Sequence, residues 1–64
     1  MATRRNTKER ILDVAEGLFA QQGFAATSVS EIAAQVGISS PGIYKHFSNK
    51  FAIYEQVCHR LFTP

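Results

Sequence analysis

The chain has 64 residues, 45% hydrophobic and 19% charged, a length and composition typical of one small globular domain. Its net charge of +2 is too small to identify a partner, and its single cysteine, Cys58, excludes an internal disulfide and fits a reducing compartment such as the cytoplasm. No apolar run approaches the roughly 20 residues of a membrane-spanning helix, and the basic start lacks the apolar segment of a signal peptide, so we expect no membrane partner.

Apolar residues at helical spacing predict a first helix over about residues 7–22. It should end at Gly23, because glycine readily adopts the left-handed conformation that follows many helices. The preceding residues, 1–6, contain Arg4 and Arg5 and predict a flexible basic arm.

A second, shorter helix is predicted between Ser28 and Gly37. Ser28 and Glu31 have the spacing of a capping box, in which each side chain accepts a hydrogen bond from the other residue's backbone N–H. Glycine at position 37 again favours a helix end. The expected inner face consists of Val29, Ile32, Ala33 and Val36.

A third helix is expected to begin after Ser39, its N-cap, and to extend to about Phe47. Pro41 would occupy the second helical position, where its missing N–H has no helical partner to lose. Ile43 and Phe47 are four residues apart and should face inward together. This leaves a mostly polar set on the outer surface: Ser40, Pro41, Gly42, Tyr44, Lys45 and His46.

A fourth helix should open at Ser48 or Asn49, since both residues are good N-caps. An apolar stripe along this helix is formed by Ile53, Tyr54, Val57, Cys58 and Leu61. Phe51 and Phe62 widen the stripe beyond what three short helices could cover.

The second and third predicted helices have the features of a helix-turn-helix. Their backbones approach closely only if the contact residue is small, as Ala33 is, and Gly37 supplies the positive φ of the turn. The second helix then braces the third, whose N-terminal end can enter the major groove of DNA and reach base edges. We therefore predict an all-α fold: a three-helix, homeodomain-like bundle with a helix-turn-helix, followed by the start of a fourth, linking helix.

Three segments carry the most specific pattern: GFAATSVSEIA at residues 23–33, VGIS at 36–39, and IYKHF at 43–47 with Asn49 and Lys50. Together they resemble the N-terminal domain of the TetR family of transcriptional repressors, over about residues 8–57. The resemblance implies that residues 7–64 form the double-stranded DNA-binding domain of a ligand-released repressor associated with the nucleoid. It also implies a homodimer on a palindromic operator, and a small-molecule effector bound by a C-terminal domain. This sequence matches none of that second domain, so we expect it to be a fragment.

The resemblance also implies which residues contact DNA. The Tyr44 ring should rest on the scaffold while its hydroxyl reaches a phosphate. Lys50 opposes the dipole of the fourth helix, which suggests a phosphate as its partner. Gly42 stands where the family usually has Thr, Ser or Ala, so a hydroxyl contact is lost. The predicted DNA-binding residues are Thr27, Ser28, Ser39, Ser40, Pro41, Gly42, Tyr44, Lys45, His46 and Lys50, with Arg4 and Arg5 as candidates for the backbone or minor groove.

Other readings stay open at this point. For His46, a surface histidine that binds nothing is an equal alternative to a DNA contact. A protein-interaction module would use the exposed apolar residues of the last helix: Phe51, Tyr54, Leu61 and Phe62. Catalysis or metal binding would rest on His46, Cys58 and His59 alone. Cys58 and His59 are adjacent in a helix, so their side chains point about 100° apart, and no second pair of ligands exists to complete a metal site. No nucleophile, base and orienting group can be assembled either. We therefore expect no enzyme, metal or cofactor.

Overall fold

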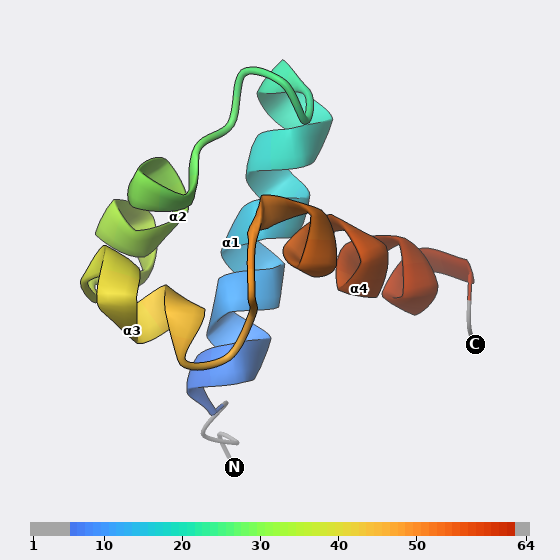
Figure 1. Cartoon of the computed structure of the whole chain (residues 1–64). Coiled ribbons are helices and arrows are strands. Elements are labelled where there is room, and N and C mark those ends of the chain that lie inside the picture. The colour runs from blue at the N-terminus through green and yellow to red at the C-terminus, as the bar shows by residue number, and fades with distance from the viewer. Residues whose placement is uncertain (1–5, 63–64) are drawn as a thin grey trace, which may run out of the picture.

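The computed structural model describes residues 6–62, which form four helices and, within that range, no strand. The helices are α1 (Thr7–Gln22), α2 (Val29–Val36), α3 (Ser40–Tyr44) and α4 (Lys50–Phe62). Figure 1 shows α1 at the centre, α2 and α3 on one side of it, and α4 on the other. α1 packs against α2 and α4, and α3 packs against α2. The predicted all-α helix-turn-helix bundle is confirmed, and Arg4 and Arg5 lie outside the described residues.

The starts of α1 and α4 are fixed by asparagine caps. Asn49 Oδ1 accepts a hydrogen bond from the Ala52 N–H at 2.8 Å, which confirms a start at the second of the two predicted caps. Asn6 Oδ1 accepts from the Glu9 N–H, also at 2.8 Å. Asn6, the last residue of the predicted arm, is therefore the N-cap of α1.

The capping box at the start of α2 forms only in part. Ser28 Oγ accepts a hydrogen bond from the Glu31 N–H at 3.0 Å, as predicted. The Glu31 carboxylate, however, accepts its hydrogen bond from Gln22 Nε2 at 2.8 Å and not from the Ser28 backbone. The last residue of α1 lies beside the first turn of α2, so a side-chain amide takes the place of the backbone donor.

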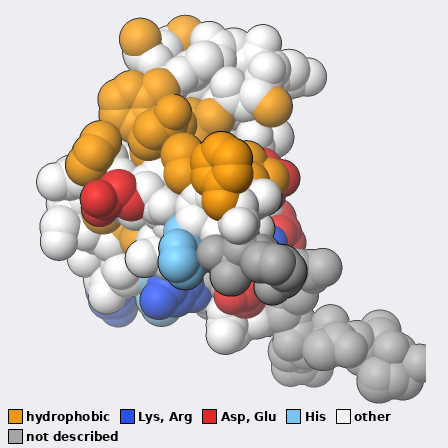
Figure 2. Space-filling model, turned by 90° about the vertical axis from the view of Figure 1, so that its right-hand side faces the viewer, with side chains coloured by type: hydrophobic (Ala, Val, Ile, Leu, Met, Phe, Trp, Pro, Cys, Tyr) orange, Lys and Arg blue, Asp and Glu red, His pale blue; other side chains and the backbone are white. Residues whose placement is uncertain are grey.

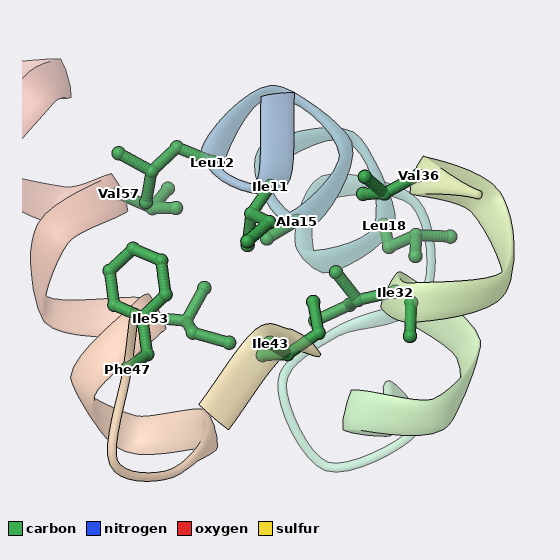
Figure 3. Close-up of a cluster of buried hydrophobic side chains, with 11 residues drawn as sticks. Ile11, Leu12, Ala15, Leu18, Ile32, Val36, Ile43, Phe47, Ile53 and Val57 are labelled. Carbon is green, nitrogen blue, oxygen red and sulfur yellow. The ribbon is translucent and has the colours of Figure 1, made fainter. Parts of the chain in front are cut away.

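The core lies where the four helices converge, as Figure 3 shows. Its largest fully buried side chains are isoleucines, one from each helix, so each helix is anchored by a branched apolar residue. The eleven buried hydrophobic residues are Ile11, Leu12, Ala15, Leu18, Ile32, Ala33, Val36, Ile43, Phe47, Ile53 and Val57.

The third helix is shorter than predicted, because α3 ends at Tyr44 and the next two residues form a turn. The N–H groups of His46 and Phe47 both donate to the Ile43 carbonyl, at 2.9 and 3.0 Å. Sharing one acceptor closes the helix and turns the chain, so that Phe47 enters the core with 5% of its surface exposed. The predicted inward orientation of Ile43 and Phe47 is nevertheless confirmed.

The apolar stripe of α4 divides into a buried and an exposed part. Ile53 and Val57 are buried, whereas Leu61 keeps 61% of its surface exposed and Tyr54 keeps 37%. The same helix is tied to α1 by Arg60, whose Nη2 donates to Asp13 Oδ1 at 2.8 Å. Because of this hydrogen bond, and because two further α1 carboxylates lie close by, the pKa of Arg60 is raised.

Candidate DNA-binding surface

The turn between α2 and α3 depends on Gly37, whose φ of 93° and ψ of 27° are left-handed. The N–H groups of Gly37 and Ile38 both donate to the Ala33 carbonyl, at 2.9 and 3.0 Å, and so end α2. Ala33 is buried, with 2% of its surface exposed, at the position where a small side chain was predicted. The chain thereby reverses within three residues and starts α3.

Serine hydroxyls gather where the first turns of α2 and α3 meet. Ser39 Oγ accepts a hydrogen bond from the Gly42 N–H at 3.3 Å and caps α3, with Pro41 in the first turn. Ser30 Oγ and Ser40 Oγ lie 3.4 Å apart, which brings the starts of the two helices side by side. This end of the helix pair therefore presents hydroxyl groups together with the first-turn backbone.

The outer side of α3 and of the following turn is mostly polar, and no other part of the domain covers it. Tyr44 keeps 51% of its surface exposed, and Pro41, Lys45 and His46 are exposed as well. Among residues 6–62, the structure gives the side chains of Tyr44, Lys45 and His46 no hydrogen-bond or ion-pair partner. These groups are thus available to an external ligand.

Lys50 has a partner inside the domain. Its Nζ donates to the Phe24 carbonyl at 2.6 Å and lies 4.1 Å from the centroid of the Phe24 ring. The contact fixes the start of α4 to the turn between α1 and α2, so the position of Lys50 needs no phosphate to explain it. An ammonium has three N–H donors, and two remain for other acceptors.

Thr27 differs from its prediction. Its side chain is buried, with 1% of its surface exposed, and its hydroxyl donates to the Gly23 carbonyl at 2.8 Å. The same oxygen accepts from Gln22 Nε2 at 3.4 Å. Thr27 therefore holds the turn between α1 and α2 together, and its hydroxyl is not available to a phosphate. The sequence could not separate a structural role from a phosphate contact here, because Thr27 lies between a glycine turn and a serine cap, where either role is common.

No role for Arg10 was predicted from the sequence, but the structure shows one. Its Nη2 donates to the Val36 carbonyl at the end of α2, at 2.7 Å, across 26 residues of sequence. One sequence feature could have suggested this contact. The last turn of α2 contains no basic residue, so a cation from another helix can bind its terminal carbonyls.

The charge distribution favours an anionic ligand on the side of α3. Three of the five acidic residues, Glu9, Asp13 and Glu16, surround Arg60 at distances of 3.8, 2.8 and 3.7 Å. The segment 32–54, which contains α3 and the turns on both sides of it, has no Asp or Glu and carries Lys45 and Lys50. Of these two, Lys45 is exposed and has no ion-pair partner among residues 6–62, whereas Lys50 is half-buried against Phe24.

An apolar face lies on a different part of the surface, over α4 and the end of α1. Figure 2 shows hydrophobic side chains gathered on the side of the molecule where α4 lies. A groove of about 520 Å³ there is lined by residues such as Phe19, Leu61 and Phe62. Phe51, Tyr54 and Phe62, which were expected on a protein-interaction surface, are thus exposed. Over the described range, His, Cys, Asp and Glu form no cluster of three that could hold a metal, and no helix there is long and apolar enough to span a membrane.

A comparison with known families identifies the kind of protein. The family described as "Bacterial regulatory proteins, tetR family" matches residues 11–57, more than half of the chain. The chain belongs to the TetR family. Its match covers α2, α3 and the turn between them, so residues 11–57 belong to the N-terminal DNA-binding domain of a TetR-family protein.

Curated relatives agree with this assignment. The chain is 47% identical over 51 residues to the uncharacterized HTH-type transcriptional regulator YerO of Bacillus subtilis, covering 80% of this chain and 18% of the relative. It is 42% identical over 53 residues to the HTH-type transcriptional regulator AcrR of Shigella flexneri, covering 83% and 25%. It is 41% identical over 49 residues to the biofilm operon icaADBC HTH-type negative transcriptional regulator IcaR of Staphylococcus aureus, covering 77% and 26%. All three relatives are named as transcriptional regulators and none as an enzyme, which agrees with the prediction that this chain is not an enzyme.

Proposed function

We propose that this chain binds double-stranded DNA sequence-specifically, with α3 in the major groove. The observation that carries the proposal is the orientation of α3: Ile43 is fully buried, while Tyr44 and the turn after it are exposed and unpartnered. A short helix fixed from behind in this way presents its N-terminal residues to base edges. The absence of acidic residues from segment 32–54 supports the approach of a polyanion.

The contacts divide into two kinds. Base edges and thymine methyl groups would be met by residues at the start of α3 and just after it: Ser40, Pro41, Gly42 and Lys45. Phosphates would be met by the Tyr44 hydroxyl, by the two free N–H donors of Lys50, and by the hydroxyls of Ser28 and Ser39. His46 lies beside them and would contact the backbone. Both capping serines use their oxygen as an acceptor within the domain, so each hydroxyl proton remains for a phosphate oxygen.

For the whole protein, we propose a cytoplasmic, nucleoid-associated homodimer on a palindromic operator. The chain spans 18–26% of the length of the curated relatives it matches, so the remaining part of such a protein would supply dimerisation and effector binding. One of those relatives is named a negative transcriptional regulator, which supports repression. In this proposal, a small-molecule effector releases the DNA.

Salt dependence of duplex binding tests the proposal. The 64-residue chain should bind a mixed-sequence duplex with a Kd of roughly 10⁻⁴–10⁻⁶ M at physiological salt. Its affinity should fall as salt increases, so that log Kd rises linearly with the logarithm of the salt concentration. Fluorescence anisotropy of a labelled duplex between low and moderate salt measures this. An affinity that barely changes over that range would contradict DNA binding.

Two lysine variants separate DNA binding from docking of a protein on α4. Lys45→Ala removes an exposed charge without a partner among residues 6–62, so it should weaken duplex binding while leaving the unfolding temperature unchanged. Lys50→Ala also removes the Phe24 contact, and its thermal unfolding must be measured beside its affinity. A protein-interaction module that uses the apolar face would be unaffected by Lys45→Ala.

A further inference from the structure

The C-terminal end of α2 is fixed by a charged side chain from α1. The Arg10 guanidinium donates to the Val36 carbonyl, one of the terminal carbonyls that lack a partner inside an eight-residue helix. The Ala33 carbonyl already receives two N–H groups from the turn. A cation at a helix C-terminus also interacts favourably with the helix dipole.

The N-terminal end of α2 is held by a separate set of contacts. Gln22 Nε2 donates to Glu31 Oε1 at 2.8 Å, to the Ala26 carbonyl at 3.2 Å and to Thr27 Oγ1 at 3.4 Å. These contacts do not involve Arg10. Loss of the arginine would therefore leave one end of α2 held and release the other, which is the end that leads into α3.

From these contacts we propose that Arg10 is a positioning residue for DNA binding, acting through α2 on α3. This inference rests on the proposed function. α3 has five residues and packs against α2, so its direction follows the end of α2. An eight-residue helix is about 12 Å long, and a tilt of about 5° moves its free end by about 1 Å. Base-edge hydrogen bonds need donor–acceptor distances of about 2.7–3.2 Å, so such a shift misaligns α3 without unfolding the domain.

The test compares two variants that each lose one positive charge from the start of α1. Arg10→Met removes the contact to Val36 and keeps a long side chain of good helix propensity. Lys8→Met is the matched control, because Lys8 is exposed and its Nζ only approaches the Phe47 ring, at 5.8 Å from the centroid. A duplex selected from a random pool by the wild-type chain and a scrambled duplex are the two probes, and the measured quantity is the ratio of their Kd values.

Arg10→Met should lower this preference about five- to tenfold, roughly the loss of one good base contact, while Lys8→Met keeps the wild-type ratio. Arg10→Lys should regain most of the preference, because a lysine ammonium can also hold a backbone carbonyl, as Lys50 holds that of Phe24. The salt slope of Arg10→Met should equal that of the wild type.

Three results would overturn the inference. One is an Arg10→Met preference equal to that of Lys8→Met. Another is that Arg10→Met weakens binding to both duplexes equally and reduces the salt slope by about 0.9, which would mark Arg10 as a phosphate ligand. The third is a loss in Arg10→Lys as large as that in Arg10→Met. A wild-type chain that prefers no selected duplex would instead refute sequence-specific binding, and the inference with it.

Discussion

Replacing Gly37 with alanine tests whether the turn between α2 and α3 requires a left-handed residue. A Cβ built at Gly37 would meet no atom within 4 Å, so the substitution creates no clash with its surroundings. Its cost is therefore conformational, because the residue has φ +93°. A left-handed L-residue costs roughly 1–2 kcal/mol, and the stiffer unfolded chain returns about 0.4–1 kcal/mol. We expect a net destabilisation of about 1 kcal/mol.

Gly17→Ala is the matched control, since Gly17 lies within α1 and a Cβ there also meets nothing within 4 Å. Its backbone is helical, so alanine should stabilise the domain by roughly 0.5–1 kcal/mol. In a domain of this size 1 kcal/mol shifts Tm by about 4–8 °C. Thermal unfolding followed by circular dichroism should therefore show a lower Tm for Gly37→Ala and a higher Tm for Gly17→Ala. If the two variants were stabilised alike, the turn would not need the left-handed conformation.

Three further substitutions test other parts of the structure. Ile43→Val shortens a fully buried side chain and should cost about 0.5–1.5 kcal/mol in urea unfolding; no loss would mean that α3 is not anchored there. Arg60→Met should cost at most about 1 kcal/mol at low salt, since the Arg60 side chain is 28% exposed. That loss should shrink at high salt, and an equal loss at both would exclude an electrostatic cause. Gly42→Ala should stabilise the domain by up to about 1 kcal/mol, because its Cβ would contact Ile38 Cδ1 at an ordinary 3.4 Å; a lower Tm would show strain.

The helix-turn-helix was predictable because its determinants are local. The cap at Ser28, the glycine at position 37 and the spacing of Ile43 and Phe47 each depend on a few neighbouring residues. Side-chain periodicity therefore predicted which residues of α3 face the core. The end of α3 was not predicted, because the two N–H groups that share the Ile43 carbonyl follow from the path that takes Phe47 into the core.

Contacts between distant segments could not be predicted from periodicity. Arg10 meets the Val36 carbonyl and Lys50 meets the Phe24 carbonyl, each across 26 residues. A long cationic side chain reaches many acceptors, and only the packing of the helices selects one. The sequence therefore suggested no partner for Arg10 and only a phosphate for Lys50. Burial of Thr27 follows in the same way from the packing of Gln22 against the start of α2.

Backbone amide NMR shifts during titration with a duplex test most directly which surface binds DNA. If α3 enters the major groove, the largest changes should fall on the amides of Ser39, Ser40, Gly42 and Lys45, and the C-terminal half of α4 should change little. Changes confined to the exposed apolar residues of α4, with α3 silent, would contradict the account.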